Sequence, residues 1–380
     1  MCKLRHLRQA FPEVISLTVI LVLAGAMVLP VALLFRARPV LAAAPVVSIQ
    51  RVSLSSRGSE GNGDCGYWAS ISADGRYVAF QSLASNLVLN DTNDVDDIFV
   101  HDRQTGQTTR VSLSSGGSEG NGHCWDASIS ADGRYVAFHS LASNLVPDDT
   151  NGESDVFVHD RQTGETARVS LSSGGTEGNS SSGSPSISAD GRYVAFVSLA
   201  TNLVPGDNKF WDTFVHDRQT GQTTRVSMSS GGKKGNGGSG NPSISADGRY
   251  VAFNSDATNL VPGDTNGVVD VFVHDRQTGQ TVRVSLSWDG SEGNDASCNP
   301  SISADGRYVA FWSDATNLVP DDTNGFPDIF VQDWAEVAVA ASAGGLPGGV
   351  IAGIVIGAVA VVGALAFFWF RRPKNIPPVS

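Results

Sequence analysis

The sequence predicts an all-β fold made of five similar units, each with four antiparallel strands, and three observations lead to this prediction. The stretch Ser-Ile-Ser-Ala-Asp-Gly-Arg-Tyr-Val-Ala-Phe occurs five times, and its Asp recurs at spacings of 58, 58, 57 and 58 residues. A fixed period of this size is typical of repeat architectures in which neighbouring units share one core. No segment of the repeat shows the 3.6-residue period of an amphipathic helix. The repeated Asp residues are Asp74, Asp132, Asp190, Asp247 and Asp305.

The unit that starts at Asn241 shows why each element is expected. Asp247-Gly248 predicts a tight hairpin turn, because this pair supplies the residues with positive φ that such turns need. A longer loop at Asp256–Val269 and a second tight turn at Arg276–Gly279 separate the remaining runs, which are rich in Val, Phe and Thr. The four expected strands are Pro242–Ser245, Tyr250–Ser255, Asp270–Asp275 and Gln280–Ser287.

The two ends of the repeat region predict a closed ring. Residues 46–334 begin with Val47–Ser55, which resembles the fourth strand of a repeat but has no first three strands before it. They end with Ile329–Asp333, which resembles the third strand of a repeat and has no fourth strand after it. If these two strands pair, every blade is complete and no sheet edge is left exposed. We therefore expect a five-bladed β-propeller of four-stranded antiparallel blades, closed by an N-terminal strand. The alternative, an open β-solenoid, requires capping units, and the sequence contains none that we recognise.

The repeated stretch resembles a known family. Ser-x-Asp-Gly-Arg-Tyr-Val-Ala-Phe is similar to the WD40-like PD40 repeat of TolB-type bacterial propellers, and the likeness covers the first hairpin of all five units. The Asp-Arg-Gln-Thr-Gly turn is also typical of such blades. The resemblance implies a propeller fold and a bacterial, extracytoplasmic setting. TolB itself is a soluble six-bladed propeller with an extra N-terminal domain, whereas this sequence predicts five blades and a membrane span. The resemblance therefore does not imply the role of TolB in the envelope Tol system.

Residues 1–45 are expected to be a signal peptide or an N-terminal membrane anchor. Lys3, Arg5 and Arg8 precede Val14–Phe35, a run of 22 residues without a charge. The basic start and the small residues before Pro45 favour a signal peptide, whereas the length of the apolar run favours an anchor. Both alternatives place the chain from residue 46 onward outside the cytoplasm.

The other end of the chain predicts a membrane span. We expect residues 335–345 to be a linker, 346–370 a transmembrane helix and 371–380 a cytoplasmic tail. No charge interrupts the second of these segments, and it is long enough to cross a bilayer. Basic residues at 371, 372 and 374 favour a cytoplasmic end. The predicted location is therefore the cell membrane, with one or two spans and a monomeric propeller outside the cytoplasm.

Charge and cysteine content exclude some classes of partner. The formal net charge is −12, which disfavours nucleic acid as a ligand. The sequence has no Cys-x-x-Cys pair, so a zinc or redox motif is not expected. Cys65, Cys124 and Cys298 precede the repeated Asp of their units. One disulfide between neighbouring units, or free thiols, are both open alternatives.

Ligand-binding residues are expected on the variable loops. Strand order places the two tight turns of each unit at one end of the sheets and the long, variable loops at the other end. Binding sites usually lie on loops that a rigid scaffold holds in place. Four tryptophans on or beside these loops are candidates for stacking on a sugar or a peptide, and the alternative is that each packs over its own loop. They are Trp68, Trp125, Trp211 and Trp288.

The loops between the second and third strands carry an Asp-Thr-Asn pattern that predicts a Ca²⁺ site. Oxygen-bearing side chains at loop positions 1, 3 and 7 suit this cation, which takes roughly six to eight oxygen ligands. The alternative is a plain turn, because Asp and Asn bond their own backbone in such bends. The third unit breaks the pattern with Lys209. The candidate ligands are Asp91, Asn93, Asp97, Asp149, Asn151, Asp155, Asp264, Asn266, Asp270, Asp322, Asn324 and Asp328.

A third group of loops, before each first strand, carries a recurring glutamate. The residues are Glu60, Glu119, Glu177 and Glu292, and the fourth unit has Lys233-Lys234 at this place instead. Their expected state is ordinary solvated charge.

The sequence favours a binding module over an enzyme. It contains no His-Glu-x-x-His helix and no phosphate-binding loop. The histidines of His-Asp-Arg-Gln recur in four units, which is typical of scaffold rather than catalysis. We expect a non-enzymatic module for a glycan or protein ligand, with no cofactor other than Ca²⁺. The alternative is a propeller enzyme such as a glycan-cleaving hydrolase, which needs two carboxylates at a set separation.

Overall fold

The computed structural model describes residues 49–207 and 209–334. The expected signal peptide or anchor, the linker from residue 335, the transmembrane helix and the cytoplasmic tail lie outside the described residues. The chain divides into two units, Met1–Gln50 and Arg51–Ser380, and the sheets described below belong to the second unit. Among the described residues, no helix has the length and hydrophobicity needed to cross a membrane.

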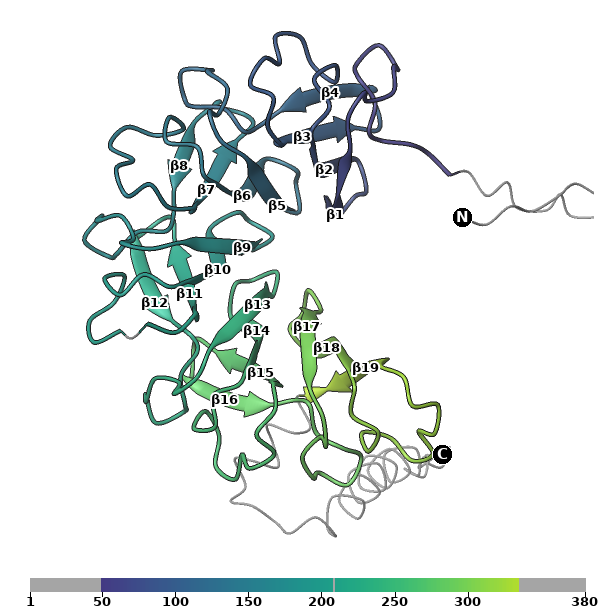
Figure 1. Ribbon diagram of the computed structural model, residues 1–380, viewed down its shortest axis with the longest axis vertical. Coiled ribbons are helices and arrows are strands. Elements are labelled where there is room, and N and C mark those ends of the chain that lie inside the picture. Colours follow the sequence, from purple (N-terminus) through teal and green to yellow (C-terminus); the bar gives the residue numbers. More distant parts are fainter. Residues whose placement is uncertain (1–48, 208, 335–380) are drawn as a thin grey trace, which may run out of the picture. The chain divides into compact units, whose positions relative to one another are not determined.

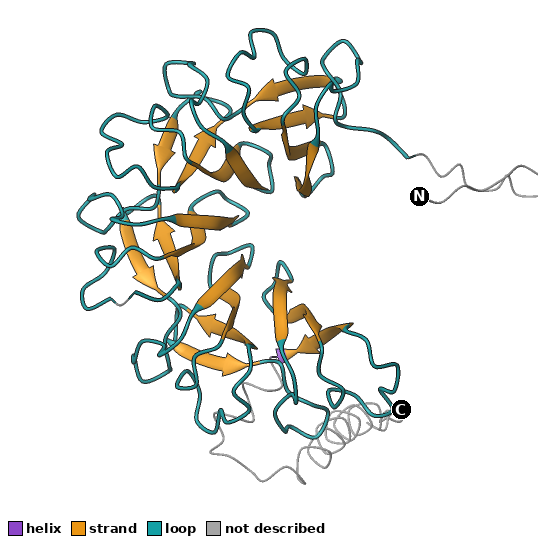
Figure 2. Cartoon of the chain, in the orientation of Figure 1, coloured by secondary structure: helices purple, strands orange, loops and turns teal. Residues whose placement is uncertain are grey.

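The described part of the second unit consists of five antiparallel sheets that follow the five repeats (Figures 1 and 2). The first sheet contains β1 (Cys65–Ile71), β2 (Tyr77–Ser82), β3 (Asp97–Asp102) and β4 (Gln107–Arg110). The second contains β5 (Cys124–Ile129), β6 (Tyr135–Ser140), β7 (Asp155–Asp160) and β8 (Thr166–Arg168). The third contains β9 (Ser182–Ile187), β10 (Tyr193–Ser198), β11 (Asp212–Asp217) and β12 (Gln222–Arg225). The fourth contains β13 (Ser239–Ile244), β14 (Tyr250–Ser255), β15 (Asp270–Asp275) and β16 (Gln280–Arg283). The fifth contains β17 (Ser297–Ile302), β18 (Tyr308–Ser313) and β19 (Asp328–Asp333).

The second and third strands of the fourth sheet have the predicted bounds, while its first and fourth strands differ. β13 starts three residues earlier than expected and bulges between Gly240 and Ser243. Pro242 lies inside this bulge, where its missing N–H costs no ladder hydrogen bond. β16 ends at Arg283 because Leu286 forms an isolated bridge with Glu292, which turns the chain toward the next sheet.

The Asp-Gly turn also fixes how one sheet meets the next. In the fourth sheet only Gly248 of the pair has a positive φ, at 72°, and the Asp247 carboxylate accepts hydrogen bonds from the Ser245 hydroxyl and the Arg249 N–H. Gly248 lies against the ring of Tyr193 in the third sheet. The guanidinium of Arg276 covers the same ring at 4.4 Å, a favourable cation–π distance.

Consecutive sheets share their hydrophobic cores. One cluster joins Ala79 and Val100 of the first sheet to Val136, Phe138 and Phe157 of the second, and all five side chains are fully buried. Equivalent clusters join the second sheet to the third, the third to the fourth and the fourth to the fifth. Burying each of these valine and phenylalanine side chains contributes roughly 1.5–3 kcal/mol. Because every shared cluster draws on two repeats, this is the multi-bladed propeller arrangement rather than a set of independent sheets.

The predicted closing strand is not formed by the described residues. Residues 49–55 belong to no strand, and Leu54 instead bridges Glu60 and accepts a hydrogen bond from the Thr108 hydroxyl of the first sheet. β19 pairs only with β18, so the fifth sheet has three strands. Val331 is 66% exposed, whereas the equivalent Val100 is fully buried. Residues 47 and 48 of the expected strand lie outside the described residues, and from Leu54 onward the chain makes the same short bridge that Leu113 makes after β4.

Candidate functional site

The two ends of each sheet differ as the sequence predicts. At the end with the tight turns, Arg134 forms a bidentate pair with Asp160, with Nε–Oδ1 and Nη2–Oδ2 distances of 2.9 and 2.6 Å. This pair lowers the pKa of the Asp160 carboxyl to about 2. The same pair recurs in the other sheets, for example Arg76 with Asp102. Repeating one ion pair in every unit is what a scaffold requires, so this end offers no distinctive site.

The repeated histidines belong to this scaffold. His159 is buried, and its Nδ1 lies 2.8 Å from the Thr166 hydroxyl oxygen. That hydroxyl donates its proton to the Leu113 carbonyl, so the histidine nitrogen donates to the hydroxyl. Burial lowers the pKa of His159 to about 4, which keeps the ring neutral at pH 7.

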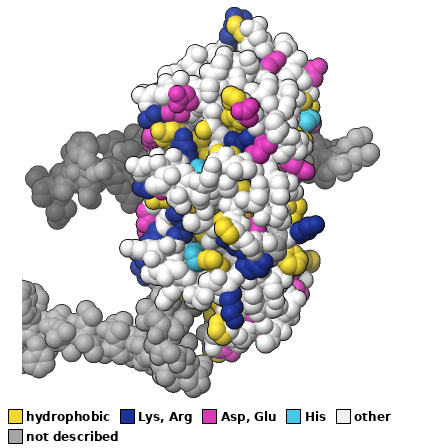
Figure 3. Space-filling view, turned by 90° about the vertical axis from the view of Figure 1, so that its left-hand side faces the viewer, with side chains coloured by type: hydrophobic (Ala, Val, Ile, Leu, Met, Phe, Trp, Pro, Cys, Tyr) yellow, Lys and Arg dark blue, Asp and Glu magenta, His cyan; other side chains and the backbone are white. Residues whose placement is uncertain are grey.

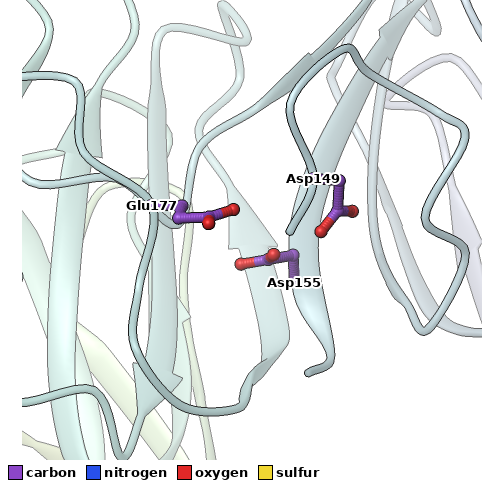
Figure 4. Close-up of side chains that lie close together, drawn as sticks. All are labelled: Asp149, Asp155 and Glu177. Atoms are coloured by element: carbon purple, nitrogen blue, oxygen red, sulfur yellow. The ribbon is translucent and has the colours of Figure 1, made fainter. Parts of the chain in front are cut away.

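The Asp-Thr-Asn loops assemble around an arginine. Asp149, Asp155 and Glu177 place carboxylate oxygens within 4.8 Å of one another, and Figure 4 shows the three groups facing one another. The Nη1 of Arg168 lies 3.2, 3.0 and 2.8 Å from these three carboxylates. A guanidinium therefore already supplies positive charge at the place where the sequence predicts Ca²⁺. The first and fourth sheets repeat this cluster with Arg110 and Arg283.

The remaining polar groups of these loops are also engaged. The side-chain amide of Asn151 donates to Asp155 Oδ2 and to the Gly178 carbonyl, both at 2.9 Å, while its oxygen accepts the Glu153 N–H. The Thr150 N–H donates to Glu177 from the next repeat at 3.2 Å. Glu119, Glu177 and Glu292 thus accept hydrogen bonds from the loop of the preceding repeat rather than being simply solvated. Glu60 instead pairs with Arg51 and is exposed. Calcium binding stays a prediction, and these contacts are those of the alternative, a hydrogen-bonded turn.

Two repeats depart from the arginine cluster. In the third, Arg225 pairs with Asp207, and Lys234 from the next repeat donates to the Gly206 carbonyl at 2.8 Å where the other repeats have a glutamate. In the fifth, Asp322 Oδ1 is buried without a partner among the described residues. The arginine that would complete this last cluster by repeat position is Arg51, which pairs with Glu60.

The four candidate tryptophans do not form one site. Trp68 and Trp288 are 65% and 69% exposed, and neither lines the cavity described next. Trp125 packs between the rings of His123 and His139, at centroid distances of 5.5 and 5.3 Å. Trp211 lines a cavity.

This cavity, of about 560 Å³, lies where the second, third and fourth sheets meet at the end with the variable loops. Serines and glycines at the start of β9 and β13 line it, together with His139 from β6 and Asn254 from β14. Trp211, which directly precedes β11, is also part of its lining and is 40% exposed. Small-molecule sites in proteins have volumes of roughly 300–1,000 Å³, so the size fits a ligand.

Backbone bulges bring polar side chains to this cavity. Asp126, Ser184 and Asn241 line it, and each has a positive φ, at 54°, 48° and 49°. All three occupy the bulge in the first strand of their sheet. The left-handed conformation costs a non-glycine residue on the order of 1–3 kcal/mol, and such residues cluster at functional sites. Asn299 repeats this conformation in the fifth sheet, and its side-chain oxygen accepts a hydrogen bond from Asn241 at 2.8 Å.

Three polar atoms at the cavity have no partner among the described residues. His139 Nδ1, Ser154 Oγ and Asn254 Oδ1 are buried and make no hydrogen bond with any of them. Burial also lowers the pKa of His139, with the Asp126 carboxylate acting in the opposite direction from 3.7 Å. A buried polar atom without a partner costs about 1–3 kcal/mol, so three of them around one cavity indicate that a ligand or water completes them.

Loop-based reasoning missed His139 and Asn254, although the sequence contains a signal for them. They occupy the variable position of Tyr-Val-Ala-Phe-x-Ser, a strand that is otherwise identical in all five repeats. When one position varies in an otherwise identical strand, its side chain contacts different groups in each repeat. The five residues at this position are Gln81, His139, Val197, Asn254 and Trp312.

The outer strands of the second and third sheets also border hollows, of about 480 and 490 Å³, whose linings include Arg168 and Arg225. On the side that Figure 3 shows, acidic and basic side chains are interspersed, and hydrophobic side chains are scattered. The cysteines offer no site either, because Cys65, Cys124 and Cys298 are all free thiols and no two of them form the disulfide that the sequence left open. Because His139, Ser154 and Asn254 leave buried polar atoms without hydrogen bonds there, the 560 Å³ cavity is the candidate functional site.

Comparisons with known proteins point to other propellers at low identity. No protein-family model and no curated protein matches the sequence. Among solved structures, TolB from Acinetobacter baumannii is 19% identical, with 69% of this chain and 53% of that chain covered and a TM-score of 0.40. A putative TolB from Agrobacterium tumefaciens is 16% identical, covering 70% and 74%, with a TM-score of 0.39. The β-propeller domain of the Trilobed protease from Pyrococcus furiosus is 11% identical, covering 71% and 69%, with a TM-score of 0.43.

The chain thus spans about half the length of the A. baumannii TolB. All three TM-scores are below 0.5, so the propeller arrangement of this protein rests on its own sheets and shared cores. An oligogalacturonate lyase in complex with manganese, 13% identical and with a TM-score of 0.43, is also similar, so the similar structures include an enzyme.

Proposed function

We propose that this protein is an extracytoplasmic binding module that holds its ligand in the 560 Å³ cavity at the variable end of the sheets. The observation that carries this proposal is the set of three buried, unpartnered polar atoms at the cavity, in a chain whose other strand positions largely repeat. The lining of this cavity does not repeat, because His139, Val197 and Asn254 occupy the same strand position in the three sheets around it, so the cavity is suited to present a specific site. The ligand classes are a glycan or a protein segment.

A binder is favoured over an enzyme by the state of the cavity groups. The acid–base pair at the cavity, His139 Nδ1 and Asp126 Oδ2, is separated by 3.7 Å, which is beyond hydrogen-bonding distance. An orienting hydrogen bond of this kind accompanies an imidazole that acts as a base, and it can tighten only when the substrate binds. Cleavage of a bound glycan is the alternative activity, and its signature is turnover.

We also propose that the five sheets close into a complete five-bladed ring. In the first sheet, Arg110 contacts both Asp91 and Asp97, and the Ser112 hydroxyl donates to Asp97 at 2.5 Å. Arg51 and Ser53 occupy the positions of Arg110 and Ser112 in the repeat, one repeat earlier. In a closed ring they would take the same roles in the fifth sheet. Their missing partners are the acidic groups of the fifth sheet, where Asp322 Oδ1 is buried and unpartnered among the described residues. Docking of Arg51 would place a charge there and shorten the exposed edge of β19.

The segments outside the described residues supply the proposed location. The uninterrupted apolar stretch at 346–370 and the basic residues that follow it favour a membrane anchor with a cytoplasmic tail. With this orientation the cavity faces the outside of the cell. Protease added to intact cells is expected to cut the linker at 335–345, and cutting only after lysis would contradict the orientation.

A screen of the full-length protein against neutral, anionic and cationic glycans and against peptides tests the function. Both binding and product formation are scored for every compound. We expect binding without turnover, and Trp211→Ala is expected to weaken it because this side chain lines the cavity. Trp288→Ala, which removes an exposed tryptophan away from the cavity, is the matched control. Product formation would identify the enzyme alternative, and the absence of any bound compound would contradict the proposal.

A further inference from the structure

We propose that the cavity takes a neutral, hydroxyl-rich ligand, namely a saccharide of one or two rings. This inference rests on the proposed binding function and specifies its ligand. Three properties of the cavity support it: the hydrogen-bonding groups that it leaves unpaired, the charges around it, and its shape.

The unpaired groups match hydroxyls. His139 Nδ1 and Asn254 Oδ1 come from the second and fourth sheets, and the Ser154 hydroxyl comes from the residue directly before β7. A neutral imidazole nitrogen and a hydroxyl each donate or accept according to tautomer or rotation, and the Asn254 amide oxygen accepts. A ligand hydroxyl also does both, so a molecule with several hydroxyls on a rigid ring can satisfy all three groups at once.

The charges exclude an anionic ligand. Within the described part of the chain, the ionisable groups at the cavity besides His139 are the carboxylates of Asp126 and Asp256, and no lysine or arginine lines it. Burial lowers the pKa of His139, so this ring carries no positive charge at pH 7 to attract an anion. Uronates and phosphates would meet two negative charges without a compensating cation.

A neutral ligand is favoured over a cationic one by burial. The Asp126 carboxylate is about one-third exposed and Asp256 is exposed, so both keep much of their hydration without a ligand. The three unpartnered atoms are buried and have no partner to lose among the described residues. The binding free energy is therefore most favourable when ligand hydroxyls supply the hydrogen bonds that these three atoms lack. An ammonium would only replace water at a hydrated carboxylate.

The shape of the cavity suits a sugar ring. Trp211 provides an aromatic surface on which the C–H face of a pyranose can pack, and Val197 adds a second apolar surface. Other lining groups are small: Gly183 and Gly240 lie at the start of β9 and β13, where a larger side chain would occupy the space. The left-handed bulges at Ser184 and Asn241 hold further polar side chains in fixed positions, which reduces the entropy cost of binding.

The test is isothermal titration calorimetry on the full-length protein in a detergent without a sugar headgroup. The probes are cellobiose and N,N′-diacetylchitobiose as neutral disaccharides, digalacturonate as an anionic one and the disaccharide of glucosamine as a cationic one. We expect at least one neutral disaccharide to bind and digalacturonate not to bind. A preference for the glucosamine disaccharide over both neutral probes would overturn the inference.

Variants at one repeat position provide matched controls. Asn254→Val and His139→Val each remove a group that the cavity leaves unpaired, and Val197 shows that the same strand position accepts valine. Each change is expected to weaken binding of the neutral disaccharide about tenfold. Gln81→Val is the equivalent change in the first sheet, away from the cavity, and is expected to leave the affinity within about twofold.

The outcomes separate this inference from the proposed function. Equal affinity of Asn254→Val, His139→Val and the unchanged protein for the neutral disaccharide would overturn the saccharide site. If the glycan and peptide screen returns only charged glycans or peptides, with loss of binding in Trp211→Ala, the saccharide inference fails while the binding function stands. If no compound of any class binds, the proposed function itself fails.

Discussion

The ring of Tyr193 lies so close to Gly248 of the next sheet that a Cβ at this glycine would meet the ring carbon Cδ2 at 2.1 Å. The same contact recurs between Tyr77 and Gly133, Tyr135 and Gly191, and Tyr250 and Gly306. The glycine of the Asp-Gly turn is therefore required for two reasons: its own φ of 72° and the neighbouring aromatic ring. A residue that satisfies a turn within one repeat also sets the spacing to the preceding repeat.

Replacing this glycine is expected to cost more stability than its backbone conformation alone explains. Gly248→Ala should lower the free energy of unfolding by several kcal/mol, because about 1 kcal/mol of left-handed strain adds to a steric cost of roughly 1–3 kcal/mol. Gly279→Ala is the matched control, since Gly279 has a φ of 74° and no atom within 4 Å of the place that a methyl group would take. Urea denaturation of both variants gives the comparison. Equal losses in the two variants would show that Tyr193 moves aside without cost.

We expect the arginine of the Asp-Thr-Asn clusters to decide whether calcium binds there. In the unchanged protein the guanidinium of Arg168 contacts Asp149, Asp155 and Glu177, so we expect a weak melting response to Ca²⁺. Arg168→Gln leaves three carboxylates without a cation, and Ca²⁺ should then raise stability by about 2.7 kcal/mol at a hundredfold excess over Kd. Melting curves with chelator and with added Ca²⁺ measure both responses.

Two controls accompany this calcium test. Asp149→Asn together with Asp155→Asn should abolish any response that depends on this cluster, while Asp207→Asn in the third repeat should not change it. A strong loss of melting temperature when chelator is added to the unchanged protein would show that Ca²⁺ binds alongside the arginine, as the sequence predicts. No response in Arg168→Gln would show that the loops are turns in either case.

Ring closure predicts an energetic coupling between Arg51 and Asp322. If Arg51 docks on the fifth sheet, the changes Arg51→Ala and Asp322→Ala are expected to couple by roughly 0.5–3 kcal/mol in a double-mutant cycle. The positive control is Arg110 with Asp91, whose side chains lie 3.1 Å apart within one complete cluster. Additive effects of Arg51→Ala and Asp322→Ala, within about 0.5 kcal/mol, would show that the ring stays open at β19.

The buried histidines predict a loss of stability in weak acid. Burial lowers the pKa of His159, His216 and His274 to about 4, whereas an exposed histidine titrates near 6.5. Between these values the unfolded chain binds protons that the folded chain does not, so stability is full above about pH 6.5 and falls as the pH drops toward 4. The slope is at most about 1.4 kcal/mol per pH unit for each histidine. The carboxyl of Asp160, whose pKa is lowered to about 2, contributes mainly below this window, whereas burial raises the pKa of Asp212 to about 6, which partly offsets the loss within it.

Glutamine is a suitable replacement for the buried histidines, because Gln332 occupies the same repeat position in the fifth sheet. The triple change His159→Gln, His216→Gln and His274→Gln is expected to flatten the dependence of unfolding free energy on pH between about 6.5 and 4. Denaturation at several pH values in this range measures the slope. An unchanged slope in the triple variant would assign the acid sensitivity to other groups.

The sequence by itself determined the local architecture. The second and third strands of each repeat, the Asp-Gly turns and the separation of repeated turns from variable loops follow from periodicity and turn chemistry, which act over a few residues. Tyr250–Ser255 and Asp270–Asp275 were predicted at their observed bounds for this reason. The bulge at Gly240–Ser243 was not predicted, because a bulge depends on what the inner strand faces.

Only the tertiary structure decided which side chains meet across repeats. Arg168 lies 13 residues from Asp155, and Glu177 comes from the following repeat, so the sequence showed carboxylates without the guanidinium that joins them. Cavity formation by His139, Trp211 and Asn254 likewise requires three sheets to be placed side by side. Contacts within a repeat are set by short-range backbone preferences, whereas contacts between repeats depend on packing angles that accumulate from sheet to sheet. The site of this protein consists of contacts of the second kind.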